Sequence, residues 1–143
     1  MILGTVSRNE TILTWAGEVV HDEWLRSDTI RSEVQLDEFV VMPNHFHAIV
    51  WIAGATSLSP LPRRANGPTP RSLSSLMAAF KIASTKRINK RSGSPGRPIW
   101  QRDYYDRVLR NERELERARQ YIVDNPARWA EDVNNPASRH FKQ

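Results

Sequence analysis

The stretch that decides the fold is VQLDEFVVMPNHFHAIVWI, residues 34–52. Branched and aromatic residues, which favour strands, stand on both sides of Pro43 and Asn44, a pair typical of turns. We therefore predict a β-hairpin with one strand over residues 34–42 and a second over residues 45–52.

The sequence before this hairpin predicts a smaller hairpin and a helix. Short apolar runs at residues 2–6 and 11–13 flank Asn9-Glu10 and are typical of two paired strands. Thr14 is suited to cap a helix, which we expect to end before Ser27. The apolar stripe of that helix consists of Ala16, Val20 and Trp24.

Beyond residue 52 the pattern changes from strands to helices. Residues 53–68 predict a loop, and Thr69 followed by Pro70 predicts the start of a helix. A second loop is expected at residues 92–98, which contain two glycines and two prolines. The apolar stripe of the helix consists of Leu73, Leu76, Met77, Phe80 and Ala83.

The C-terminal third predicts a short strand in the later part of residues 99–109 and then a third helix. Asn111, with Glu114 three residues later, resembles a capping box, and Pro126 ends the helix after Asp124. The whole order of elements indicates an α+β fold with an antiparallel sheet, in one domain over residues 1–143.

Composition limits the class of protein. The 143 residues include no cysteine, which excludes disulfides, thiolate metal sites and thiol nucleophiles. We find neither a membrane-spanning apolar run nor a signal peptide, so we expect a cytoplasmic protein without membrane partners.

Charge is distributed unevenly along the chain. Residues 1–38 carry eight acids and three bases, residues 39–102 carry ten bases and no acid, and residues 103–143 carry eight of each. A long stretch without carboxylates is typical of a surface that binds a polyanion such as nucleic acid. A solvated basic face that only raises solubility is the other interpretation.

Two places carry candidate chemistry. His45 and His47 are two residues apart on the second predicted strand, so their imidazoles share a face and can converge on one divalent ion. On the third helix, Tyr121 and Asn125 are one turn apart, which lets the Asn125 amide join an ion near the tyrosine hydroxyl. Arg117, one turn earlier, is placed to meet a phosphate. Packing roles for all four site residues are the alternative.

The segments LDEFVVMPNHFHAIVWI (36–52), TPRSLSSLMAAFKIASTKRIN (69–89) and WQRDYYDRVLRNERELERARQYIVDNPARW (100–129) together resemble the single-tyrosine HUH transposases. The similarity is greatest to the REP-associated tyrosine transposases and covers nearly the whole chain. It implies a ferredoxin-like α+β fold, with an antiparallel sheet, helices on one face and a C-terminal tyrosine-bearing helix.

The resemblance also implies an activity, which is cleavage and rejoining of single-stranded DNA near hairpins through a 5′-phosphotyrosyl intermediate. Tyr121 matches the nucleophile, His45 and His47 match the metal-binding histidines, and Asn125 matches the position of a third ligand. Mg²⁺ or Mn²⁺ is the implied cofactor, and association with the bacterial nucleoid is the implied location. The basic residues expected to contact DNA are Arg71, Lys81, Lys86, Arg87, Lys90, Arg91, Arg102 and Arg117.

Other functions stay open. A catalytically weak or inactive protein of the same fold could bind single strands by stacking bases on its aromatic side chains. A replication or conjugation nickase is a second enzymatic alternative, although such enzymes usually have larger chains. Tyr104 and Tyr105 are rival nucleophiles, but they precede the third helix.

Relatives in the resembling family usually have one more apolar strand before the segment that matches residues 3–20. Only Ile2 and Leu3 are available for it in this sequence after Met1, so we expect either a truncated gene or a start codon assigned too far downstream. An exposed edge on the strand that carries the histidines is then expected to weaken stability and catalysis and to favour a homodimer.

Overall fold

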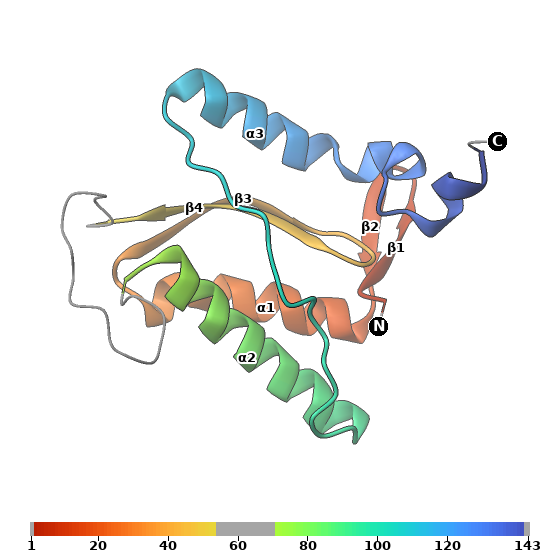
Figure 1. The fold of residues 1–143 in the computed structure, drawn as a ribbon, viewed down its shortest axis with the longest axis horizontal. Helices are drawn as coiled ribbons and strands as arrows, with labels where there is room; N and C mark the ends of the chain where they lie inside the picture. Colours follow the sequence, from red (N-terminus) through yellow and green to blue (C-terminus); the bar gives the residue numbers. More distant parts are fainter. Residues whose placement is uncertain (1, 54–70, 142–143) are drawn as a thin grey trace. The chain divides into compact units, whose positions relative to one another are not determined.

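The computed structural model describes residues 2–53 and 71–141, and it is an α+β protein built on antiparallel strand pairs. This confirms the expected fold class and is compatible with a ferredoxin-like fold. In chain order the elements are β1 (Gly4–Ser7), β2 (Glu10–Leu13), α1 (Trp15–Ile30), β3 (Val34–Val41), β4 (Phe46–Ile52), α2 (Leu73–Ser92), α3 (Glu112–Asp124) and the 3₁₀ helices η1 (Pro126–Glu131) and η2 (Pro136–Phe141), shown in Figure 1.

The chain divides into two compact units, which we describe separately. Unit 1 comprises Met1–Val20, Glu38–Ile49 and Asp103–Gln143, and unit 2 comprises His21–Asp37 and Val50–Arg102. The prediction of one domain over residues 1–143 stays a prediction. No helix in the described part of the chain is long and apolar enough to cross a membrane.

The first strand pair of unit 1 is the small hairpin expected from the sequence. β1 and β2 are antiparallel, with Ser7 opposite Glu10. The connecting residues, Arg8 and Asn9, have φ of 50° and 66°, the left-handed conformation that suits a two-residue hairpin turn. The backbone N–H of Leu3 donates to the Pro43 carbonyl at 2.7 Å, which ties the start of the chain to the turn before His45.

The second strand pair, β3 with β4, confirms the predicted hairpin. Its turn is closed by the Met42 N–H, which donates to the His45 carbonyl at 2.9 Å. Within unit 1, Ile49 of β4 packs with Leu115 and Ile122 of α3 in an apolar cluster. Val40, Leu109 and Ala118 pack against the same cluster. Within unit 1, α3 therefore packs against the part of this hairpin that carries Ile49, and this contact fixes where Tyr121 can reach.

Both ends of α3 follow the sequence closely. The side chain of Asn111 accepts from the Glu114 N–H at 2.9 Å, while the Glu114 carboxylate accepts from the Arg110 N–H at 2.8 Å. This is the expected capping arrangement, except that the Glu114 carboxylate accepts from the N–H of Arg110 and not from the N–H of the cap residue Asn111. At the other end Asn125 caps the helix before Pro126, which has no N–H and begins η1.

Helix α1 continues to Ile30, so the expected end before Ser27 is wrong. The Ser27 hydroxyl donates to the Glu23 carbonyl one turn earlier, so the side chain is satisfied inside the helix and does not break it. The start is as expected, because the Thr14 hydroxyl accepts from the Gly17 N–H.

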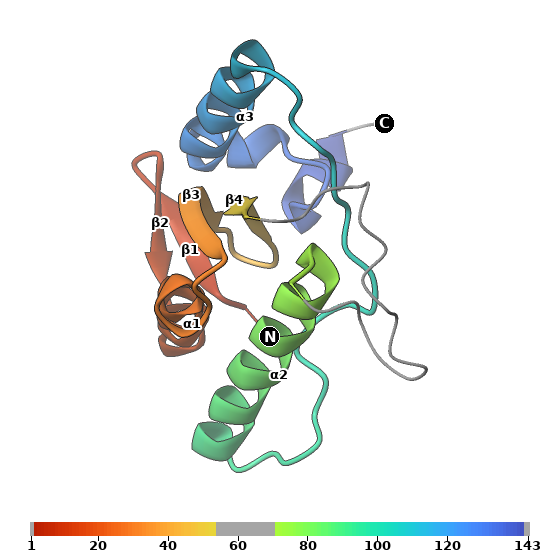
Figure 2. The same cartoon turned by 90° about the vertical axis from the view of Figure 1, so that its left-hand side faces the viewer.

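In unit 2, α1 and α2 pack through aromatic side chains. The rings of Trp24 and Phe80 meet edge to face, with centroids 5.1 Å apart, and the two helices lie side by side in Figure 2. The Ser84 hydroxyl donates to the Phe80 carbonyl and accepts from the Trp100 indole N–H. From the predicted stripe of α2, Leu76 and Phe80 are fully buried.

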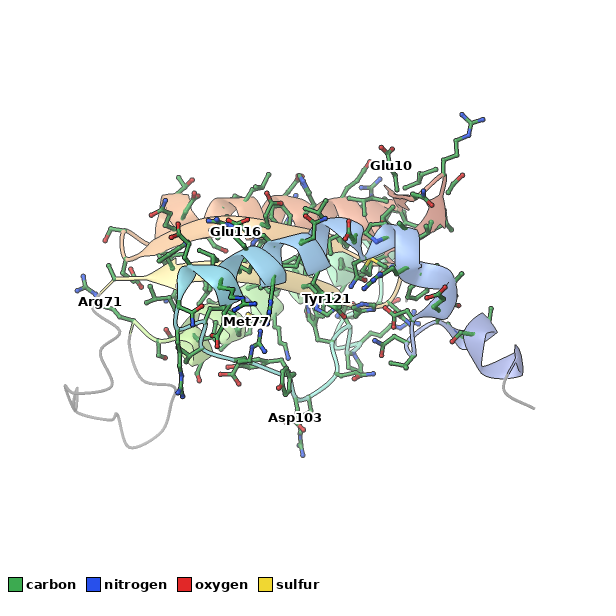
Figure 3. All side chains as sticks on the ribbon, turned by 90° about the horizontal axis from the view of Figure 1, so that it is seen from above. Glu10, Arg71, Met77, Asp103, Glu116 and Tyr121 are labelled. Carbon is green, nitrogen blue, oxygen red and sulfur yellow. The ribbon has the colours of Figure 1, made fainter. Side chains whose placement is uncertain are left out.

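The residue that caps α2 is Ser72 and not Thr69, because Ser72 and Ser75 cap each other reciprocally. Arg71, just before the cap, lies at the start of this helix in Figure 3 and has φ of 54°. Gly93 ends the helix in the left-handed conformation. Thr69, Pro70 and all but the first residue of the predicted 53–68 loop lie outside the described residues.

The strand predicted within residues 99–109 is wrong, because none of these residues forms a strand. A strand needs a neighbour to satisfy its backbone, and the described strands pair only as β1 with β2 and β3 with β4. Two side chains of this segment are largely exposed, Tyr105 at 92% and Val108 at 73%.

Arg87 of α2 serves a structural role that the sequence did not indicate. Its guanidinium donates to the buried Glu23 carboxylate of α1 at 2.8 Å. We expect Arg87→Ala to lower the free energy of unfolding by about 1–2 kcal/mol, because a buried carboxylate loses its nearest partner while Arg26 stays within reach. Urea denaturation measures this, and a Lys86→Ala control at an exposed position of the same helix should change stability by less than about 0.5 kcal/mol. Equal stability of the two variants would contradict the assigned role.

Candidate active site

Two histidines meet at the start of β4 in unit 1. His45 is the last residue of the turn and His47 is the second residue of the strand. Their ring centroids are 4.8 Å apart with the ring planes at 82°. The structure thus brings together the pair that the strand periodicity predicted on one face.

The tautomer of His45 follows from its neighbours. Asn44 donates its amide N–H to the Asn134 carbonyl at 2.7 Å, which leaves its amide oxygen facing Nδ1 of His45 at 2.8 Å. That oxygen can only accept, so Nδ1 carries the proton. In the neutral ring Nε2 then has a free lone pair, the form in which an imidazole binds a metal.

Tyr121 reaches the histidines from α3. Its ring lies 5.5 Å from the His47 ring, centroid to centroid, at an interplanar angle of 78°. The side chain is 50% exposed, and Figure 3 shows it on the opposite flank of α3 from Glu116. A phenol that touches the histidine pair and is still open to solvent is accessible to a large substrate.

In the sequence, Asn125 lies midway between Tyr121 and Trp129, whose rings each lie close to one of the histidines. Four residues before it Tyr121 meets His47, and four residues after it the Trp129 ring lies 6.0 Å from the His45 ring. The Asn125 side chain is buried. The predicted candidates His45, His47, Tyr121 and Asn125 thus all belong to unit 1.

Three of these residues bury polar atoms that have no hydrogen-bond partner among the described groups. They are Nε2 of His45, Nε2 of His47 and Oδ1 of Asn125. Leaving a buried polar atom unpaired costs about 1–3 kcal/mol, so each of these three atoms calls for a partner. Two imidazole nitrogens and an amide oxygen suit a divalent cation.

The candidate metal ligands include the side-chain amide of Asn125 as well as the two histidines. Within the described residues, no three His, Cys, Asp or Glu side chains are grouped so that they could hold a metal by themselves. A cation at this site would need an oxygen ligand in addition to the two imidazoles, and the Asn125 amide is the candidate that the sequence predicted. On that donor set the residues present fit Mg²⁺ or Mn²⁺.

Asp132, which follows η1, is a site residue that the sequence analysis missed. Its Oδ2 atom lies 3.8 Å from Nε2 of His45, and the side chain is 12% exposed. Trp129 was missed as well. No spacing in the sequence distinguishes these residues, because Trp129 lies in the short 3₁₀ helix η1 and Asp132 directly follows it, where α-helix and strand periodicity give no guidance.

The surroundings lower the pKa of both histidines. For His45 burial is the largest cause and the charge of His47 the next, while Asp132 opposes them. For His47 burial lowers the pKa, and Asp132 again acts in the opposite direction. Both rings are therefore neutral at pH 7 and can act as ligands.

We expect the EDTA-treated protein to lose stability as the pH falls below 6.5, the unshifted histidine value. The unfolded chain takes up protons at that pH, whereas the folded histidines do so only at lower pH. The contribution of the two histidines to the free energy of unfolding is complete above pH 6.5. It is lost as the pH falls from there toward the lowered pKa values of the folded histidines. Urea midpoints at pH 7 and pH 5.5 measure it, and a His45→Ala/His47→Ala variant should show a smaller change.

The basic candidates are placed mostly in unit 2. Lys86, Lys90 and Arg91 are exposed on α2, whereas Arg87 binds Glu23 and Lys81 donates to the Gln101 carbonyl at 3.1 Å. Arg71 and Arg102 are exposed in the same unit, and Arg117 is exposed on α3 of unit 1.

Comparison with known proteins yields one informative similarity. The chain is 31% identical over 139 residues to a protein of Haemophilus influenzae described as uncharacterized, and the alignment covers 92% of this chain and 76% of that protein. No family model matches the chain, and no solved structure matches it.

Proposed function

This chain belongs to the same family as its Haemophilus influenzae relative, and we propose that it is a metal-dependent single-strand DNA transesterase. The proposal assigns it to the type of enzyme represented by the REP-associated tyrosine transposases. It acts in the cytoplasm on hairpin-bearing DNA of the nucleoid.

The observation that carries the proposal is the meeting of an accessible tyrosine with two buried, unpaired imidazole nitrogens. Tyr121 touches His47, and Nε2 of both histidines lacks a partner among the described groups. Structural histidines usually have both nitrogens satisfied. A divalent cation held by His45, His47 and Asn125 would neutralise charge on a bound phosphate.

Tyr121 supplies the nucleophile in this proposal. Its phenol oxygen forms a bond to phosphorus, and the bond from phosphorus to the 3′ oxygen of the preceding nucleotide breaks. The phenol proton passes to water, which reaches the half-exposed side chain, and the leaving 3′ oxygen takes up a proton. The phosphotyrosyl bond keeps the phosphodiester energy, so a 3′-hydroxyl can reverse the step without ATP.

In this proposal the basic residues contribute affinity for the DNA backbone and do not recognise the base sequence. Contacts between Lys or Arg and phosphates release counterions and position the strand. The exposed members on α2 are Lys86, Lys90 and Arg91. Arg87 is excluded from the main contacts, because its guanidinium holds Glu23.

A non-catalytic single-strand binder is the second candidate. The observation in its favour is the exposed Tyr105, which offers a stacking platform on a segment without strand pairing. Such a protein would bind the same DNA and form no covalent link.

One experiment separates the two functions. The protein is mixed with a pool of single-stranded oligonucleotides that carry a hairpin flanked by random nucleotides, with Mn²⁺ or with EDTA. The transesterase transfers a 3′ label to the protein on a denaturing gel, releases a 5′ label as a short free strand, and does neither in EDTA. Binding without any covalent product would support the second candidate instead.

A further inference from the structure

We propose that Asp132 is a carboxylate ligand of the divalent cation bound by His45 and His47. This inference rests on the proposed function, because it extends the metal site described above. It adds to that site the only negative charge among its ligands.

The geometry around His45 carries the inference. Nε2 of His45 and Oδ2 of Asp132 face each other at 3.8 Å, too far apart for a hydrogen bond. Because the proton of the neutral imidazole is on Nδ1, directed at Asn44, both facing atoms are acceptors. Two acceptors in a mostly buried setting repel each other unless a cation lies between them.

The separation suits a shared ion. Bonds of about 2.1 Å put neighbouring ligands of an octahedron about 3.0 Å apart and opposite ligands about 4.2 Å apart. The observed 3.8 Å lies between these limits. As they are placed in the structure, His45, His47 and Asp132 do not by themselves form a metal-holding group, so Oδ2 of Asp132 would have to move toward the ion when it binds.

Asp132 is held in place by the same loop that orients His45. Its Oδ1 atom accepts from the Asn134 N–H at 2.7 Å, and its carbonyl accepts from the Ser138 hydroxyl at 2.7 Å. The Asn134 carbonyl in turn accepts from the Asn44 amide. One oxygen of the carboxylate is thus occupied and the other is left directed at the histidine.

The chemistry of the donor set explains why a carboxylate would strengthen the binding of a divalent cation. Mg²⁺ and Mn²⁺ prefer oxygen ligands, and carboxylates bind them better than neutral imidazoles do. His45, His47 and Asn125 are all neutral ligands. Asp132 would therefore add the anionic oxygen that these three neutral ligands lack.

Asp132→Asn tests the proposal with little change of shape. The amide oxygen keeps the bond from the Asn134 N–H, while the amide nitrogen becomes a donor toward Nε2 of His45. Mn²⁺ affinity of the full chain, followed by the EPR signal of free Mn²⁺, should fall by about tenfold or more. The melting temperature in EDTA should stay the same or rise, because two facing acceptors become a donor and an acceptor.

Glu131→Gln is the matched control, since it removes the exposed neighbouring carboxylate and should leave Mn²⁺ affinity unchanged. Wild-type affinity in Asp132→Asn would overturn the role of Asp132 alone. Failure of the wild type to bind Mn²⁺ would overturn the metal site, and with it the proposed function. An equal loss of Mn²⁺ affinity in both variants would show that any nearby negative charge has the same effect, and it would also overturn the role of Asp132 as a ligand.

Discussion

Replacing Tyr121 with phenylalanine is expected to abolish the covalent protein–DNA product, to below the detection limit of a denaturing gel. The variant lacks only the hydroxyl oxygen that we propose attacks phosphorus. Its ring can still meet the His47 ring, whose centroid lies 5.5 Å away, so the fold should be kept. Because we propose that basic residues elsewhere contact the phosphates, single-strand affinity should remain within a few-fold of the wild type.

Tyr104→Phe and Tyr105→Phe are the matched controls for this change. Both residues lie in the exposed segment before α3, and each variant loses one hydroxyl. They should retain the covalent product. If the covalent product persists in Tyr121→Phe and disappears in one of the two controls, the tyrosine replaced in that control is the nucleophile and Tyr121 is not.

Replacing His47 with alanine is expected to remove both Mn²⁺ binding and covalent product formation. The imidazole contributes one of the three buried unpaired atoms of the site and also meets Tyr121, the proposed nucleophile. Loss of one of a few ligands weakens a metal site by orders of magnitude, whereas loss of an orphaned polar atom does not in itself destabilise the fold. Calorimetric titration with Mn²⁺ measures the first effect, and urea denaturation in EDTA measures the second.

His21→Ala is the control for a general effect of removing histidine, because His21 lies on α1 and outside the site. It should bind Mn²⁺ as the wild type does. If His47→Ala kept both Mn²⁺ affinity and cleavage, the histidine pair would have a packing role only.

Local pattern was enough to place most elements and the first candidates of the site. Alternation on a strand put His45 and His47 on one face, and the cap at Asn111 with the stop at Pro126 gave the bounds of α3, as the structure confirms. These successes have a common cause. Periodicity and caps depend on neighbours in sequence, which the sequence displays directly.

Features that depend on distant partners were missed. The segment within residues 99–109 has a strand-like composition but no strand beside it, and Ser27 stays helical because a carbonyl one turn away satisfies it. Asp132 enters the site only because the loop after η1 returns to the Asn44 turn. Arg87 resembled a DNA contact until its buried partner Glu23 was located.

The most direct test of the central claim is to find which peptide carries the nucleotide. The covalent product is digested with nuclease and trypsin and analysed by tandem mass spectrometry. Tryptic cleavage after Arg119 and Arg128 releases residues 120–128, which contain Tyr121, while residues 103–107 carry Tyr104 and Tyr105. We expect a phosphonucleotide on Tyr121 in peptide 120–128, formed with Mn²⁺ and absent in EDTA. A modification on peptide 103–107, or one that forms equally in EDTA, would contradict the account.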